Sequence, residues 1–463
     1  MHSRWFLALY GAILSLMVVL YTTMPGFAAG SGRHSSMVQP RVLFLPTPTP
    51  TVPAATVEGI VVTVLKNIHI NGFDAQANDG LGGLWINWRY GTQPLQTNFD
   101  DAGNVHGSSV PPRQDRLVDL RYVHTLWLYK TQHPDDAQFN GELMKYTDIV
   151  KHEFANHPDE RGWVFDELID LYHLSHDAFY KHAAQAEVVF LDTKRFHRSV
   201  GAYYKTSRTH PRGYYPVDQA LEAGCALLQA GSLFHHKQWT RDGKTILAFV
   251  YQHTFLRHYH VFVSYIDHVL LANGKLNPTE TFFRGKDQGG HLINGGRVSV
   301  GQAAQEILSL LHAHLVTRDK TLLDRAQELL APFMAQPNAL GLWDKHHLGY
   351  YAALTFPGKT IAHPGTPTLS KKTKESGRQL LMLEAFQVAD MLTGGQYTGM
   401  VMAMAKVAVN LAYYAPGHGY FNQETADWKP LVLQTGANAG ETKDWVTTEA
   451  MGIALEALLS LPQ

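Results

Sequence analysis

The feature that most constrains the fold of this chain is a series of helical segments joined alternately by short and long connections. Apolar residues recur at the spacing of one buried helical face, as in Leu322, Ala326 and Leu329. With proline and aspartate start signals, this periodicity predicts twelve helices. Their expected ranges are 58 to 70, 113 to 132, 136 to 156, 160 to 175, 178 to 201, 214 to 231, 237 to 258, 299 to 316, 319 to 334, 372 to 393, 396 to 413 and 442 to 461.

The first of these segments has an alternative interpretation. The run from Ile60 to Leu65 is rich in β-branched residues, which favour strands. We retain a helix over 58 to 70 and keep a strand as the alternative.

The connections predict how the helices pack. Those after even-numbered helices are tight, and a short link makes neighbouring helices antiparallel. Those after odd-numbered helices are long, except at 157 to 159, and rich in aromatic and charged residues. Because the direction reverses at every helix, all the long loops emerge at one end. This pattern predicts an all-α fold, an (α/α)6 toroid of six hairpins with the even-numbered helices inside. An open solenoid of hairpins is the alternative.

The N-terminal part differs in composition from the rest. Residues 1 to 29 combine a basic start, an apolar run and small residues at Ala28 and Ala29, which indicate a signal peptide or an N-terminal anchor. Residues 30 to 56 form a Thr/Pro-rich linker, and 57 to 463 the toroid domain. An extracytoplasmic location follows, either secreted or anchored by that N-terminal segment.

Charge and motifs exclude several classes of function. The formal net charge is −1, with scattered basic residues, so nothing indicates a nucleic-acid partner or a membrane contact beyond the N-terminal segment. The single cysteine, Cys225, lies in a predicted helix and indicates a buried apolar residue. No phosphate loop, dinucleotide fingerprint, nucleophile elbow or zinc helix occurs. We therefore expect neither a cofactor nor a metal.

A pair of acids opens the fourth predicted helix, in the run from Trp163 to Leu168. Glycoside hydrolysis uses one carboxyl to protonate the leaving oxygen and a second to activate water or attack the sugar. A carboxylate at the start of an inner helix would point toward the centre of the toroid, so Asp166 and Glu167 are the candidate catalytic residues. Adjacent helical positions point about 100° apart, so one of the two is expected to face the centre. The helix dipole alone also favours acids in a first turn.

At these residues the chain resembles the six-hairpin glycosidases. Residues 163 to 187 are similar to the second hairpin of unsaturated glucuronyl and rhamnogalacturonyl hydrolases, which open with a Trp-x-Asp-Asp-like motif, and Asp166 and Glu167 fall on its acidic pair. The bacterial α-1,6-mannanases are similar there too. Residues 301 to 329 and 341 to 351 resemble the mannanases and the N-acylglucosamine 2-epimerase group. The resemblance implies a toroid that acts on carbohydrate.

The long loops carry residues suited to sugar binding. Aromatic faces stack on pyranose rings, and nearby polar groups bond to hydroxyls. The candidate substrate-binding residues are Trp85, Trp88, Asp101, Tyr215, Asp287, His291, Trp343, Asp344, Tyr350, Glu424 and Trp428. Asp101, Asp287 and Glu424 are alternatives for the second carboxyl. Packing of any single aromatic residue against the helices is the competing interpretation.

The sequence thus predicts an exported glycoside hydrolase whose partner is an oligo- or polysaccharide. One alternative is a sugar epimerase or polysaccharide lyase, in which His291, His346 or Tyr215 would move a ring proton. The other is a non-catalytic surface glycan-binding toroid.

Overall fold

The computed structural model divides the chain into two compact units, Met1–Pro50 and Thr51–Gln463. The residues it describes all belong to the second unit, and the predicted leader lies outside them. They are 53–88, 98–99, 105–106, 116–155, 157–159, 161–206, 213–267, 271, 275, 280–286, 292–421, 423–432, 440, 442–443 and 445–461.

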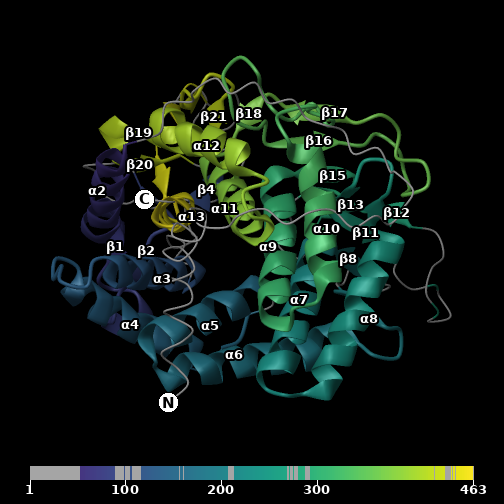
Figure 1. Cartoon of the computed structure of the whole chain (residues 1–463), viewed down its shortest axis with the longest axis horizontal. Coiled ribbons are helices and arrows are strands. Elements are labelled where there is room, and N and C mark those ends of the chain that lie inside the picture. The colour runs from purple at the N-terminus through teal and green to yellow at the C-terminus, as the bar shows by residue number, and fades with distance from the viewer. Residues whose placement is uncertain are drawn as a thin grey trace, which may run out of the picture. The chain divides into compact units, whose positions relative to one another are not determined.

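Six helices form a closed ring in the second unit (Figure 1). They are α3 (Arg116–Gln132), α5 (Trp163–Ser175), α7 (Val217–Leu233), α9 (Val300–Thr317), α11 (Ser376–Thr393) and α13 (Thr448–Leu459). Each contacts the next, and α13 contacts α3. The ring closure confirms the predicted (α/α)6 toroid over the open solenoid.

Six further helices lie outside the ring, each against one inner helix. They are α2 (Ala54–Gly72), α4 (Asn140–Phe154), α6 (Ala178–Phe190), α8 (Lys237–His253), α10 (Lys320–Leu330) and α12 (Thr398–Val407). The described residues therefore contain twelve α-helices, one for each predicted segment. The even-numbered segments are the inner ones, as expected.

Short antiparallel strands occupy the connections that lead into inner helices. The pairs are β1 (Phe73–Asp74) with β2 (Gly83–Leu84), β3 (Asn87–Trp88) with β24 (Val446–Thr447), β4 (Asn98–Phe99) with β5 (Val105–His106), β6 (Phe196–His197) with β7 (Ala202–Tyr203), β9 (Phe255–Leu256) with β10 (Val261–Phe262), β13 (Arg284–Lys286) with β14 (Leu292–Asn294), β18 (Thr373–Lys374) with β21 (Glu424–Thr425), β19 (Tyr413–Tyr414) with β20 (Gly419–Tyr420), and β22 (Leu431–Val432) with β23 (Thr442–Lys443). Two sheets have three strands, in the orders β12 (Thr281–Phe282), β11 (Tyr265–Asp267), β8 (Tyr214–Pro216) and β15 (Arg297–Ser299), β16 (Ala353–Thr355), β17 (Thr368–Lys371). Short helical turns are η1 (Asn78–Gly80), η2 (Leu191–Arg195), η3 (Ala331–Phe333), η4 (Ala408–Ala412) and η5 (Ala415–Gly417).

The β-branched first segment is helical, which settles its two interpretations. Helix α2 buries Val61, Val64, Leu65 and Ile68, an i, i+3, i+4, i+7 pattern, and packs on α13. Burial of this stripe outweighs the modest preference of valine and isoleucine for strands. The helix starts at Ala54, so the linker predicted over 30 to 56 ends earlier than expected.

Strand pairing explains several boundary errors. The largest is the helix predicted over 178 to 201, which ends at Phe190 and is followed by η2 and by Phe196–His197 paired with β7. The helix predicted from 214 begins at Val217, because Tyr214–Pro216 pairs with β11. The helix predicted from 442 begins at Thr448, because Val446–Thr447 pairs with β3. Two of the aspartate start signals are confirmed as helix caps: the side chains of Asp177 and Asp319 accept the backbone N–H of Phe179 and Thr321 at 2.9 and 3.0 Å. Searched over the described residues, no helix is both long and apolar enough to cross a membrane.

Candidate active site on the ring axis

Charged side chains occur on all the inner helices. Acidic residues outnumber basic ones: α7 and α13 each carry two acids and no basic residue. The acids of the inner helices are Asp119, Asp166, Glu167, Asp170, Asp218, Glu222, Glu306, Glu384, Asp390, Glu449 and Glu456.

A buried ion-pair network joins α3, α5 and α13. The Arg121 guanidinium lies 3.2 Å from Glu167 and 3.3 Å from Glu456. His124 Nδ1 lies 2.7 Å from Glu167 and donates a 2.9 Å hydrogen bond to Glu456. Trp163 covers the guanidinium at 4.7 Å. We call Arg121, His124, Glu167 and Glu456 the paired network.

The two glutamates of the paired network have opposite protonation behaviour. Burial disfavours the charge of Glu167, but His124 and Arg121 lower the pKa of its carboxyl to about 2. Burial, together with the charge of Glu167, raises the pKa of Glu456 to about 8 although Arg121 opposes the change. Burial alone would lower the pKa of His124, yet Glu167 and Glu456 raise it well above its usual value. At neutral pH Glu167 is therefore ionised and has no proton to donate.

Asp166 lies on a different side of α5 from Glu167, as the helical geometry requires. Its Oδ1 accepts a 2.8 Å hydrogen bond from the Gln229 amide of α7. Its Oδ2 lies 3.5 Å from His312 Nδ1 of α9, across the ring. Burial would lower the pKa of His312, but the hydrogen bond and charge of Asp166 raise it to about 9. His312 is thus a cation at neutral pH, and it retains 24 % of its side-chain exposure.

Two further acids on the inner helices keep solvent-accessible surface. Asp170, one turn beyond Asp166, is exposed, and Glu384 of α11 is half-buried. Desolvation by the surrounding helices raises the pKa of both carboxyls, while His124 and His312 oppose the change at both and Arg121 opposes it at Glu384. Both acids therefore lie within electrostatic range of His124 on α3 and His312 on α9.

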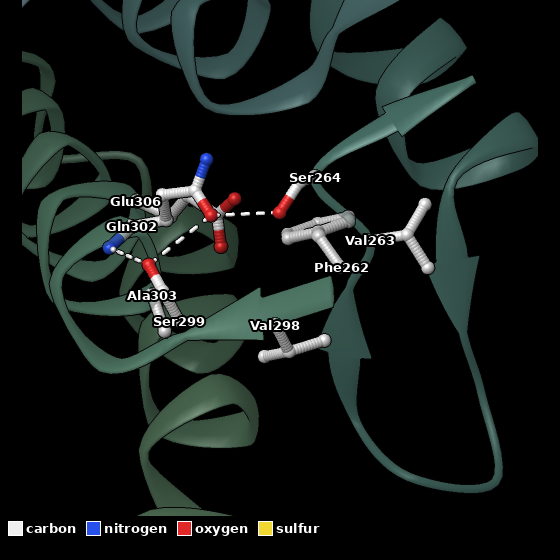
Figure 2. A pocket seen from close by; sticks show the side chains of 8 residues that line it. All are labelled: Phe262, Val263, Ser264, Val298, Ser299, Gln302, Ala303 and Glu306. Atoms are coloured by element: carbon white, nitrogen blue, oxygen red, sulfur yellow. Dashed lines mark hydrogen bonds between the residues drawn. The ribbon is translucent and has the colours of Figure 1, made fainter. Parts of the chain in front are cut away.

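A third group of acids lies at the start of α7 and α9. Asp218 is half-buried and accepts a 3.2 Å hydrogen bond from the Gln302 amide, whereas Glu222 and Glu306 are each 4 % exposed. Burial raises the pKa of all three carboxyls, and the charge of Asp218 adds to this for both glutamates. Figure 2 shows Glu306 beside Gln302 and Ser264, in a small recess next to the loop before α9.

One set of side chains has the spacing of a metal site. His124, Glu167 and Glu456 offer ligand atoms that all lie within 4.8 Å of one another. Arg121 already contacts both carboxylates, so a bound metal ion would meet a cation at van der Waals range. We therefore interpret these residues as an ion-pair network.

Many predicted substrate-binding residues are packed in the interior. Six have at most 6 % exposure: Trp88, Tyr215, Trp343, Asp344, Tyr350 and Glu424. Asp344 lies 3.1 Å from Lys374, which is itself fully buried. Trp88 packs under α2 and bonds to Asn67. These contacts hold the loops on the ring.

The remaining predicted loop residues differ in accessibility. Trp85 and Trp428 are half-buried, and Trp428 donates a 2.8 Å hydrogen bond to the His347 carbonyl. Asp101, Asp287 and His291 lie outside the described residues. Sugar contact by the loop set stays a prediction.

The sequence reasoning did not single out Asp218, Glu222, Glu306, Glu384 or Glu456. Asp218 carried a usable signal, because it lies in the first turn of a segment already assigned to the inside, two residues after Pro216. The same rule had selected Asp166. The other four lie beyond the first turn of their helices, where nothing local marks the inward direction.

Comparison with known proteins finds solved structures of similar fold. The sequence matches no family model and no curated protein. Among solved structures, an unsaturated glucuronyl hydrolase specific for heparin is similar at TM-score 0.59 and 15% identity, over 88% of this chain and 96% of that one. A D-mannose isomerase is similar at TM-score 0.56 and 11% identity, over 90% of this chain and 99% of that one. A family 76 α-mannanase from Bacteroides thetaiotaomicron is similar at TM-score 0.54 and 11% identity, over 88% of this chain and 94% of that one.

These neighbours are six-hairpin toroids, which confirms the resemblance predicted from residues 163 to 187. At such low identity the likeness establishes the fold. It leaves the reaction to be argued from the axial residues themselves.

Proposed function

We propose that this protein is a carbohydrate-active enzyme that hydrolyses glycosidic bonds of an oligo- or polysaccharide on the ring axis. The neighbours named above include two hydrolases of saccharides, which supports the class. The substrate enters from the face that bears the long loops, since the inner helices begin there and present Asp166 and Asp218 in their first turns.

The observation that carries this proposal is a pair of accessible carboxyls in different environments. Asp218 has a raised pKa and is the proton donor to the leaving oxygen. Asp166, hydrogen-bonded by Gln229 and next to protonated His312, is the carboxylate that activates water or attacks the sugar. Both glycosidase mechanisms use one carboxyl as proton donor and a second that activates water or attacks the sugar.

Glu167 has a different task in this proposal. It is a positioning residue, because its carboxylate is held by Arg121 and His124 and its pKa is about 2. Its place next to Asp166 on α5 then fixes how that helix meets α3 and α13. The acidic pair of the sequence motif thus divides into one catalytic and one structural member.

The test is reducing-sugar release by the protein from a panel of mannans, unsaturated uronides and other oligosaccharides. We expect Asp166→Asn and Asp218→Asn to lower kcat about 10²- to 10⁴-fold with unchanged Tm. The matched control is Glu328→Gln on outer helix α10, where the carboxylate pairs with Arg325 and His260 far from the axis. It should keep wild-type activity.

Two results would overturn the assignment. Activity of folded Asp166→Asn and Asp218→Asn within about twofold of wild type would remove both residues from the chemistry. Loss of activity only in Glu167→Gln, with an unchanged unfolding midpoint, would return the catalytic role to Glu167.

A sugar isomerase is the second candidate, favoured by His312. A protonated imidazole held by a carboxylate on the axis can donate a proton to a sugar oxygen, and one neighbour is an isomerase. Chromatography of reaction products separates the two functions, because hydrolysis shortens an oligosaccharide whereas isomerisation preserves its length. An isomerase would lose activity in His312→Gln and retain it in Asp218→Asn.

We also propose export of the chain. The support is the basic, apolar and small-residue order of residues 1 to 29. Fractionation of expressing cells, with N-terminal sequencing of the product, tests both secretion and cleavage near Ala28.

A further inference from the structure

A tryptophan occupies a backbone position that favours glycine. Trp428 is the last residue of a three-residue loop between Thr425 and Lys429, and its φ is 63°. Its backbone N–H donates a 3.1 Å hydrogen bond to the Thr425 carbonyl, and the N–H of Thr425 donates one of 2.8 Å to the Lys429 carbonyl. In a hairpin loop of this length the residue with positive φ is usually glycine, because a bulky side chain is strained there. Strained residues cluster at functional sites, so the indole is the part that needs an explanation.

The indole of Trp428 is held on three sides. Its Nε1 donates a 2.8 Å hydrogen bond to the His347 carbonyl. The Lys374 ammonium lies over one face, 4.6 Å from the ring centroid. A Cβ on Gly349 would lie 2.6 Å from Cζ2, so this edge packs directly on the backbone. Trp428 is nevertheless half-buried, so part of the residue stays accessible to solvent.

The lysine beneath the indole belongs to a buried support. The side chains of Lys374 and Asp344 are 0 % and 1 % exposed, and their charged atoms lie 3.1 Å apart. Asp344 Oδ1 accepts the backbone N–H groups of His346 and His347 at 3.0 and 3.2 Å, and Lys374 donates to the Leu348 carbonyl. These hydrogen bonds offset the cost of removing both charges from water. They also fix the turn whose His347 carbonyl accepts the indole N–H.

This support lies at the entrance to the ring. Strand β18 pairs Lys374 with Glu424, and the inner helix α11 begins two residues later at Ser376. Trp428 lies four residues beyond Glu424 in the same hairpin. The indole is therefore held beside the start of an inner helix, on the face that bears the long loops.

We propose that Trp428 forms a sugar-binding subsite at this entrance, where the face of its indole opposite Lys374 stacks on a pyranose unit of the oligosaccharide. The inference rests on the proposed function and adds that the substrate extends from the axis to the rim. Aromatic faces suit the C–H face of a pyranose, and a ring that is already fixed loses little entropy on binding. Packing, the competing interpretation for loop aromatics, buries Trp343 and Tyr350 but leaves Trp428 accessible.

The test measures oligosaccharide binding and turnover by the whole protein. The probes are mannotetraose, cellotetraose and a chondroitin tetrasaccharide, and saturation-transfer NMR gives each Kd. We expect at least one probe to bind wild type about tenfold more tightly than Trp428→Ala, and Trp428→Tyr to recover most of the affinity. On a substrate that is cleaved, Trp428→Ala should raise KM far more than it lowers kcat, since the lost contact is present before and during the reaction.

Two further variants separate ligand contact from folding. Trp428→Gly suits the positive φ, so it should lose the same affinity while remaining at least as stable as Trp428→Ala. The matched control is Tyr172→Ala. Tyr172 is also half-buried, with the Lys181 ammonium 5.7 Å from its ring, but it lies near the C-terminal end of α5, away from the entrance. This variant should keep the wild-type affinity.

The contrary outcomes distinguish this inference from the hydrolase proposal. Equal affinity of wild type and folded Trp428→Gly for every probe that binds would overturn the inference and leave the indole only the task of shielding Lys374. Hydrolysis with a KM unchanged in Trp428→Gly would also overturn it, while the hydrolase proposal stands. Absence of binding together with absence of hydrolysis overturns both.

Discussion

In the sector built by α3, α5 and α13, Glu167 and Glu456 share Arg121 and His124 at 2.7 to 3.3 Å. In the sector built by α7 and α9, Glu222 and Glu306 are equally buried, yet α7 carries no basic residue. Glutamates with the same degree of burial thus differ in their ionisation. Beside His124 and Arg121, Glu167 is held ionised. Burial and the charge of Asp218 raise the pKa values of Glu222 and Glu306, although Arg161 opposes the change at Glu222.

This difference separates structural from functional acids. Glu167, held by Arg121 and His124, is fixed in position and has no proton to exchange near neutral pH. Carboxyls with raised pKa values can give up a proton or receive a cation, which makes them the better candidates for chemistry and binding. The following predictions test this division, beginning with the largest effect.

Replacing Arg121 should destabilise the protein more than any other change considered. Arg121→Met leaves Glu167 and Glu456 buried without their main cation, and we expect a loss of about 3 to 5 kcal/mol in the free energy of unfolding, measured in urea. The control is Arg325→Met on α10, whose surface pair with Glu328 should contribute less than about 1 kcal/mol. Equal losses in the two variants would contradict the special role of the paired network.

The start of α7, which carries Asp218 and Glu222, depends on close backbone packing against Gly162. A Cβ there would lie 2.3 Å from the Glu222 carbonyl carbon, so α5 begins directly against α7. Gly162→Ala should cost about 2 kcal/mol in urea unfolding, as overpacking does. Gly141→Ala in α4, where nothing lies within 4 Å, should be neutral or slightly stabilising. A neutral Gly162→Ala would mean that α5 and α7 can separate without loss.

The paired network should make stability depend on pH. The pKa of Glu456 is about 8 in the folded protein against an ordinary 4.5, so above about pH 4.5 the folded state holds a proton that the unfolded chain releases. The stabilising contribution is complete below pH 4.5 and is lost as the pH rises toward 8. Between pH 5 and 8, wild type should lose at least about 1.4 kcal/mol relative to Glu456→Gln, the equivalent of one pKa unit.

Urea unfolding at several pH values measures that difference directly. The exposed Glu58→Gln serves as the control and should follow the wild-type profile. Parallel profiles for wild type and Glu456→Gln would show that this carboxyl does not hold the proton.

The smallest effect is expected at an unpaired acid. Asp170→Asn removes a carboxyl that has no ion pair within the described residues and is disfavoured by Asp166 and Glu167. Its free energy of unfolding should change by less than about 0.5 kcal/mol, or rise slightly at higher pH. A loss comparable to that of Arg121→Met would erase the contrast between the two sectors.

The sequence predicted the number and order of the helices, and which of them lie inside the ring, because these depend on the spacing of apolar residues and the lengths of the connections. Apolar spacing identifies a buried face, as in α2, and a short link makes neighbours antiparallel. It predicted Asp166 through its place at a helix start. Boundaries at Val217 and Thr448 could not be predicted, since they depend on strands paired with distant segments.

Loop residues illustrate a further limit. Trp343 and Tyr350 have the composition of a sugar-binding loop, yet both are buried against the ring. An aromatic side chain serves packing and ligand contact equally well, so composition alone does not distinguish them.

The sequence by itself determined a ring of helical hairpins with acids among its inner helices. Only the tertiary structure decided which acids are paired, because the partners come from different helices: His124 and Glu456 lie 332 residues apart and meet through closure of the ring. Protonation depends on burial and on charges within a few ångströms, and those distances exist only once α3, α5 and α13 are packed together.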